Sequence, residues 1–160
     1  MYVPVGPGYE NPYSEGYVVR FFRSDGTSWV ANFANGWTNY SFIECFQETD
    51  LVIVLAKGQG YIMSPESSTP MQTFGIDINW MQSIDKDLIA FTNDLCVGTI
   101  NKNGQIWTTE RISWDGLKDV SCKGYLLQGL SYDPTRPSDD WIPFAVDLET
   151  KHITGGSFRI

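Results

Sequence analysis

Residues 17–33 read YVVRFFRSDGTSWVANF and carry the clearest signal for the fold. β-Branched and aromatic residues dominate both ends of this stretch, which is typical of strands. The segment 24–26 between them contains Asp-Gly, and this pair between two apolar runs is a strong short-range signal for a β-hairpin. We therefore predict a strand over 17–23, a turn over 24–26 and a second strand through 29–33.

Short apolar runs separated by turn residues continue to the end of the chain. They predict strands over 42–46, 51–55, 61–63, 87–91, 96–100, 105–112, 125–132 and 141–148, with turns over 57–60, 101–104 and 149–151 and a short last strand. Apolar residues at the helical period of 3.6 are lacking, and the best candidate, 80–89, is interrupted by Asp85 and Asp87. The prediction is an all-β fold of antiparallel meander sheets built from hairpins.

Two weak internal repeats indicate that these sheets are modular. The segment DLVIV (50–54) is echoed by DLIAF (87–91) and by GYLL (124–127), and this spacing of about 37 residues is close to one four-stranded propeller blade. Likewise DGTSW (25–29) resembles NGQIW (103–107), which places a Trp at the same offset after a turn. Because three or four units are too few for an ordinary propeller, a propeller-like stack, a barrel and a two-sheet sandwich are all retained as architectures.

Length and composition favour one globular domain. The 160 residues are 42% hydrophobic and 19% charged, which is typical of a folded rather than a disordered chain. Residues 1–16, rich in Pro, Gly and Tyr, are expected to form an extended arm of this single domain over 1–160. The arm has no basic residue or apolar run, and the longest aliphatic run, 51–56, is too short to cross a bilayer. A cytoplasmic protein is expected.

The charge balance argues against nucleic acid and membranes as partners. The formal net charge is −8 at pH 7, and this charge repels phosphate and anionic lipid unless basic residues cluster. The lysines are spread through the expected turns. An acidic surface of this kind suits a basic protein partner.

Cysteine and histidine usage gives no sign of a metal or cofactor. Cys45, Cys96 and Cys122 are odd in number and lack the CxxC spacing of zinc or redox sites, so we expect reduced thiols and, at Cys45 and Cys96, small buried apolar side chains. His152, the single histidine, is expected at the surface, and a site built from several histidines is excluded. The GxG at 58–60 lacks the third glycine and the helix of a phosphate-binding loop.

Carboxylates are numerous but have no spacing that defines a site. Pairs such as Glu44 with Glu48 are expected by chance among nineteen acidic residues, and acid–base catalysis requires environments that separate two pKa values. The loop 133–140 holds three aspartates, yet it lacks the alternating ligand spacing of a known calcium loop. A solvated loop is the preferred interpretation.

The segment 107–117, WTTERISWDGL, is the densest group of aromatic and charged residues. Alternation along a strand predicts Trp107 beside Arg111 on one face and Ile112 toward a core on the other. A strand that runs into a turn explains the segment structurally. A Trp, Arg and Asp surface of the kind enriched at protein interfaces explains it functionally.

A predicted contact surface combines this segment with the loop that follows the next expected hairpin. Its proposed members are Arg111, Trp114, Asp115, Tyr132, Asp133, Arg136, Asp139, Asp140 and Trp141. They supply the mixture of aromatic and charged side chains found at the centres of interfaces.

The region 104–156 also resembles a group of small, uncharacterised bacterial β-rich proteins with a propeller-like repeat. The resemblance is carried by IW (106–107), RISWDGL (111–117), DP (133–134), PFAVDLET (143–150) and TGG (154–156). It covers about a third of the chain and implies a bacterial, cytoplasmic protein without enzymatic activity. No functional residue is carried over from it.

Three classes of function follow from these observations. The first is a non-enzymatic protein-binding module, for instance an immunity protein that neutralises a basic toxin domain. The second is an enzyme or small-sugar binder with carboxylates in a cleft, which two carboxylates within about 10 Å of each other would favour. The third is a structural subunit whose N-terminal arm adds a strand to a neighbour. The sequence favours the first, without cofactor or metal.

Overall fold

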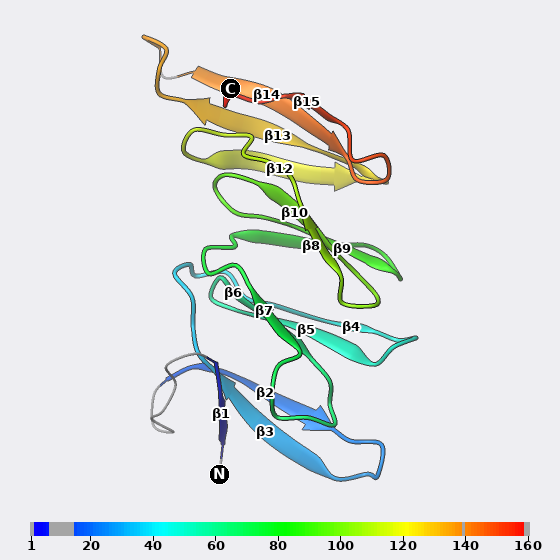
Figure 1. Cartoon of the computed structure of the whole chain (residues 1–160). Coiled ribbons are helices and arrows are strands. Elements are labelled where there is room, and N and C mark those ends of the chain that lie inside the picture. The colour runs from blue at the N-terminus through cyan, green and yellow to red at the C-terminus, as the bar shows by residue number, and fades with distance from the viewer. Residues whose placement is uncertain (1, 7–14, 139, 159–160) are drawn as a thin grey trace. The chain divides into compact units, whose positions relative to one another are not determined.

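A computed structural model describes residues 2–6, 15–138 and 140–158 of the chain (Figure 1). The described residues form fifteen strands and no helix, so none of them belongs to a helix that could span a membrane. This confirms the predicted all-β class. The chain divides into two compact units, Met1–Ile78 with Lys102–Gly104 (unit 1) and Asn79–Asn101 with Gln105–Ile160 (unit 2). Each unit is described by itself, and the single domain stays a prediction.

Unit 1 contains two sheets. Sheet A has the order β1-β3-β2, and sheet B is a four-stranded meander in the order β4-β5-β6-β7. Their strands are β1 (Val3–Val5), β2 (Tyr17–Phe22), β3 (Ser28–Phe33), β4 (Phe42–Phe46), β5 (Leu51–Ala56), β6 (Gln59–Met63) and β7 (Gln72–Phe74). The hairpin β2–β3 turns at Asp-Gly as predicted, and β1 pairs parallel to β3.

The core of unit 1 is largely aromatic on the side of sheet A, and on the side of sheet B it combines aliphatic residues with Tyr61. Alternation along β2 and β3 turns Phe21, Trp29 and Phe33 to one face, where Phe21 and Trp29 stack with ring centroids 4.7 Å apart. Phe33 lies 4.9 Å from the ring of Tyr61 in β6, and the Tyr61 hydroxyl donates a 2.8 Å hydrogen bond to the carbonyl of Ala34. Sheets A and B therefore share one apolar cluster.

Unit 2 contains two four-stranded sheets, sheet C in the order β11-β10-β9-β8 and sheet D in the order β12-β13-β14-β15. Their strands are β8 (Trp80–Asp85), β9 (Leu88–Thr92), β10 (Val97–Asn101), β11 (Ile106–Thr108), β12 (Leu117–Lys123), β13 (Leu126–Asp133), β14 (Asp140–Asp147) and β15 (Ile153–Gly155). Ala90 and Val97 of sheet C share a buried cluster with Leu127 and Phe144 of sheet D and with Ile112. The predicted core position of Ile112 is confirmed.

The sequence repeats coincide with equivalent strands of the meanders. DLVIV, DLIAF and GYLL lead into β5, β9 and β13, which are the second strands of sheets B, C and D. DGTSW and NGQIW form the turns and first residues of β3 and β11. A four-stranded antiparallel meander is the form of a propeller blade, and the predicted hairpin-built meander sheets are therefore confirmed.

Several predicted boundaries were wrong. The turn 57–60 contains only Lys57 and Gly58, which both have a positive φ, 45° and 97°, as a two-residue hairpin turn requires. The predicted strand 105–112 ends at Thr108, and β7, β8 and β12 were not predicted. Cys45 and Cys96 are half-buried instead of fully buried, and His152 is exposed as expected.

Candidate functional site

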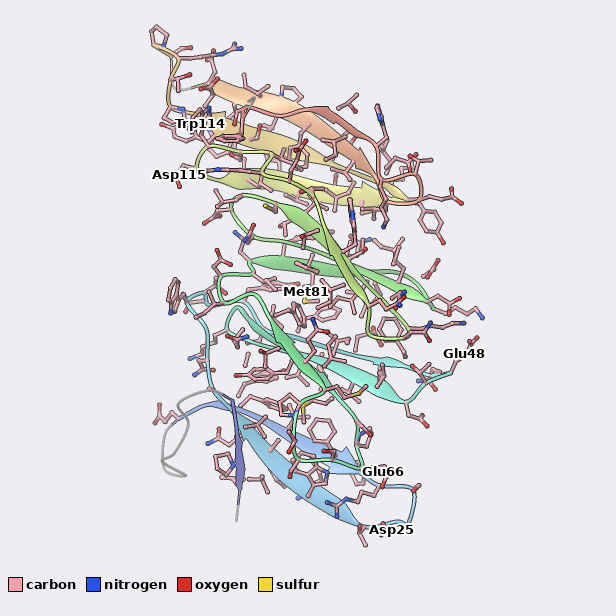
Figure 2. The ribbon with its side chains drawn as sticks, viewed as in Figure 1. Asp25, Glu48, Glu66, Met81, Trp114 and Asp115 are labelled. Atoms are coloured by element: carbon pink, nitrogen blue, oxygen red, sulfur yellow. The ribbon has the colours of Figure 1, made fainter. Side chains whose placement is uncertain are left out.

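The predicted contact surface lies at one end of sheet D, within unit 2. β13 and β14 pair Tyr132 with Trp141 and Asp133 with Asp140, so the two strand ends place these four residues side by side. Because side chains alternate across a strand, the two aromatic rings lie on one face and the two aspartates on the other. Figure 2 shows Trp114 at this same end of unit 2.

Trp114 is fixed by the C-terminal segment. Its backbone N–H donates to the Ser157 hydroxyl at 3.2 Å, and that hydroxyl donates to the carbonyl of Tyr132. Its ring meets Phe158 edge to face, with centroids 4.7 Å apart. The side chain is nevertheless 36% exposed. Trp114 is therefore a held but accessible aromatic residue, and not a fully buried one.

Arg111 packs on these rings instead of on Trp107. Its guanidinium carbon lies 4.8 Å from the ring centroid of Phe158 and 5.7 Å from that of Trp114. Its Nε donates to the Ser113 carbonyl at 2.8 Å, and a second nitrogen donates to the Trp114 carbonyl. Trp107 is covered by Lys151, whose Nζ lies 4.2 Å from the ring centroid.

The predicted pairing of Trp107 with Arg111 was wrong because the strand ends early. Thr109 is buried, and its hydroxyl accepts the backbone N–H of Val97 at 3.1 Å in place of a main-chain carbonyl. Ile112 then donates its N–H to the Leu95 carbonyl. The period-2 alternation therefore ends at Thr108, and Arg111 lies beyond the strand.

A second aromatic pair flanks Gly116. The rings of Tyr132 and Trp141 are 5.2 Å apart, and Nζ of Lys118 lies 3.9 Å from the centroid of Trp141. Gly116 has a φ of 122°, a conformation that favours glycine, and its carbonyl accepts the N–H of Tyr132 at 3.0 Å. We call Trp114, Phe158, Tyr132 and Trp141, with Arg111 and Lys118, the aromatic patch.

Two aspartates of the predicted surface, Asp133 and Asp140, are paired with the same arginine. Asp133 is buried and accepts hydrogen bonds from the Thr135 hydroxyl and N–H, at 2.6 and 3.0 Å, and from Nε of Arg136 at 3.2 Å. Arg136 also lies 3.7 Å from a carboxylate oxygen of Asp140. Asp139 lies outside the described residues, whereas Asp115 is exposed beside Trp114 (Figure 2).

These contacts predict how acid affects the loop. The hydrogen bond from the Thr135 hydroxyl, followed by the Thr135 N–H and the Arg136 charge, lowers the pKa of Asp133. A carboxyl group with a lowered folded pKa stabilises the fold above its unfolded pKa, about 4, and loses this contribution as the pH falls through the folded value. Asp133→Asn should therefore show a weaker decrease in melting temperature than the wild type as the pH falls below about 4.

The control for this measurement is Asp115→Asn, which removes one carboxylate from an exposed side chain. This variant shows how far the loss of one carboxylate charge by itself changes the pH profile. Equal pH profiles for Asp133→Asn and the wild type would show that the hydrogen bonds of Asp133 do not favour its charged form.

Sequence reasoning missed three members of this region: Lys118, Ser157 and Phe158. Lys118 lies in an unpredicted strand, and the other side chains arrive through contacts between distant segments. The only sequence signal was the TGG at 154–156, where β15 ends. The chain then turns back to Ile112, and the Ile112 carbonyl accepts the N–H groups of Ser157 and Phe158.

Unit 1 contains a separate pocket at the end of the hairpin β2–β3. It is lined by Phe22, Arg23, Ser24, Thr49, Asp50, Ser64, Pro65 and Glu66. Glu66 accepts the backbone N–H of Ser24 at 2.8 Å, and the Trp29 indole donates to the Pro65 carbonyl at 2.7 Å. Two carboxylates, Asp50 and Glu66, thus line one hollow.

A comparison with models of protein families and one with curated proteins find no match to the chain. A function is therefore proposed from the chain's own residues and their geometry. Among the residues that the structure describes, no three His, Cys, Asp or Glu side chains gather as a metal site would require.

Proposed function

We propose that the chain is a non-enzymatic protein-binding module and that the aromatic patch contacts its partner. The observation that carries this proposal is the state of Trp114, which is held by Ser157, Phe158 and Arg111 and is still 36% exposed. A large aromatic side chain that is already fixed loses little conformational entropy when a partner covers it. Trp, Tyr and Arg are also the residue types that dominate interface energetics.

The charges around the patch fit its use as an interface. Arg111 and Lys118 place their cationic groups over the rings of Phe158 and Trp141, which is the geometry of a cation–π contact. The exposed Arg136 is already paired with the buried Asp133 and with Asp140, and rim charges such as Arg136 affect the rate and salt dependence of association more than its affinity. An acidic chain of net charge −8 favours a basic partner.

The specific form of this function that we favour is an immunity protein of a bacterial cell, acting in the cytoplasm on a basic toxin domain. The acidic charge, the fixed aromatic patch and the resemblance of residues 104–156 support it. The experiment below captures the partner from the source cell and identifies it, so it would also reveal a partner that is not a toxin.

The test compares two tryptophans of different environment. Wild-type protein, Trp114→Ala and Trp37→Ala are used to capture the partner from the source cell, and its affinity is then measured by titration calorimetry. Trp37, in unit 1, is 79% exposed and serves as the matched control. Trp114→Ala should weaken binding by roughly 30-fold, the effect of an interface residue worth about 2 kcal/mol.

The melting temperatures of both variants must be compared, because a loss of folding would also reduce binding. Equal affinities of the wild type and a folded Trp114→Ala would contradict the proposal. A loss of affinity in Trp37→Ala alone would move the interface to unit 1.

A second candidate function rests on the pocket of unit 1. Phe22 is 69% exposed at this pocket, and Asp50 and Glu66 line it; an exposed aromatic residue beside carboxylates is a combination that suits a hydroxyl-rich ligand such as a sugar. NMR titration with a panel of monosaccharides should shift pocket resonances of the wild type and not those of Asp50→Asn. Without shifts in the wild type, the pocket is not a sugar site.

A further inference from the structure

The three four-stranded meanders differ at their first strands, which are all edges of their sheets. β8 and β12 each have an irregular pairing with the next strand, between Ser83 and Asp85 and between Lys118 and Ser121. Such bulges disrupt an edge and prevent another strand from pairing with it. β4 has no bulge, because its five residues pair with β5 in unbroken register from Phe42 to Phe46.

The outward main-chain groups of β4 can be identified from one hydrogen bond. The N–H of Cys45 is taken by the Glu44 carboxylate at 3.1 Å, so it does not point to β5. In an antiparallel pair, the N–H and C=O of alternate residues point to the same side. Ile43 and Cys45 therefore present their main-chain groups at the free edge, and no backbone partner for Ile43 occurs among residues 2–6, 15–138 and 140–158.

The side chains of this edge define what can pair with it. Ile43 is 46% exposed and lies on the face of sheet B that carries Val54 of the unit 1 core. Glu44 is exposed on the opposite face. Burial, followed by the negative charges of Asp50 and Glu44, raises the pKa of the Cys45 thiol. Figure 2 shows Glu48 at the β4–β5 turn.

We propose that β4 accepts an extended segment of a partner protein, in which apolar and basic residues alternate, as an added strand of sheet B. The N–H and C=O of Ile43 and the C=O of Cys45 would bind the backbone of the segment. Its apolar side chains would lie beside Ile43 and its basic ones beside Glu44. This surface lies in unit 1 and is independent of the aromatic patch.

A second copy of this chain is a poor occupant of the same edge. Pairing of β4 with another β4 would bring two Glu44 carboxylates near each other, and like charges across a strand pair are destabilising. Glu48 is paired with Lys102, but Asp50 adds to the negative charge at the turn. A basic segment replaces this repulsion by attraction.

The probe is the synthetic peptide acetyl-TVKVKVT-amide, added to isotope-labelled full-length protein and followed by NMR. The resonances of β4 are expected to shift, while those of the bulged edges β8 and β12 stay unchanged. A peptide with N-methylated valines removes main-chain donors and should lose binding. Glu44→Lys should weaken binding of the parent peptide about five- to tenfold.

Glu110→Lys is the matched control, because it makes the same change of net charge at an exposed site of unit 2, and it should bind the peptide as the wild type does. Strand addition would be overturned if the N-methylated peptide bound as tightly as the parent peptide, or if the shifted resonances belonged to residues outside β4. Dimerisation through β4 in sedimentation experiments would assign the edge to a second copy and would also overturn the proposal. None of these outcomes depends on Trp114.

Discussion

Phe33→Ala is expected to lower the free energy of unfolding by about 3 to 5 kcal/mol, the usual cost of removing a buried aromatic side chain. Phe33 has no exposed surface and is the residue at which the aromatic layer of unit 1 meets sheet B. Its ring contacts Phe21 at 6.1 Å and Tyr61 at 4.9 Å. The substitution would therefore remove two ring contacts in addition to the buried apolar surface of Phe33.

Phe22→Ala is the matched control for this effect. Phe22 belongs to the same sheet and the same residue type but is 69% exposed, so its removal should cost less than about 1 kcal/mol. Urea denaturation followed by circular dichroism measures both variants. Similar losses for the two phenylalanines would mean that the aromatic layer of sheet A does not form the core of unit 1.

The fold class was predictable because local signals determine hairpins. The Asp-Gly turn fixed β2–β3, and the alternating run 125–132 with 141–148 fixed β13–β14 to within one residue at each end. In both cases the turn residues and the apolar alternation point to the same structure, which is the condition for a reliable sequence interpretation.

Edge strands were less predictable for a physical reason. β8 and β12 have only one neighbouring strand and place polar residues such as Gln82, Ser83 and Lys118 in water. Their apolar alternation is therefore weak, and a bulge shifts its phase in each strand. β7 has only three residues, too few for a periodic signal.

The candidate site was predictable only in its hairpin part. The adjacency of Tyr132 and Trp141 follows from the pairing of β13 with β14. The position of Trp114 depends on Ser157 and Phe158, which lie more than 40 residues away in the chain. No local pattern encodes such a contact. The strand alternation that predicted the position of Arg111 ends at Thr109, where the side-chain hydroxyl accepts the N–H of Val97 in place of a main-chain carbonyl.

A glycine opposite a phenylalanine occurs in each of the three meanders. The pairs are Gly60 with Phe74, Gly98 with Phe91 and Gly129 with Phe144. None of these glycines has a positive φ, so the backbone conformation does not require glycine. The phenylalanine ring instead occupies the space of the missing side chain, an arrangement that stabilises glycine within strands.

Gly98→Val should therefore be strongly destabilising, by about 3 kcal/mol, although valine favours strands. A Cβ atom at this position would lie 2.1 Å from Cζ of Phe91, and the Phe91 ring is itself buried. The ring must leave its place or the strands must separate. Thermal and urea denaturation of the variant measure the loss.

A double-mutant cycle distinguishes this steric effect from a loss of backbone freedom. In a Phe91→Ala background the space beside position 98 is empty, so Gly98→Val should cost far less there than in the wild type, and part of the stability lost through Phe91→Ala should return. If the valine costs the same in both backgrounds, the ring is not the obstacle. Because the same pair recurs in sheets B and D, a positive result would identify the glycine–phenylalanine pair as the packing rule that the three repeats share.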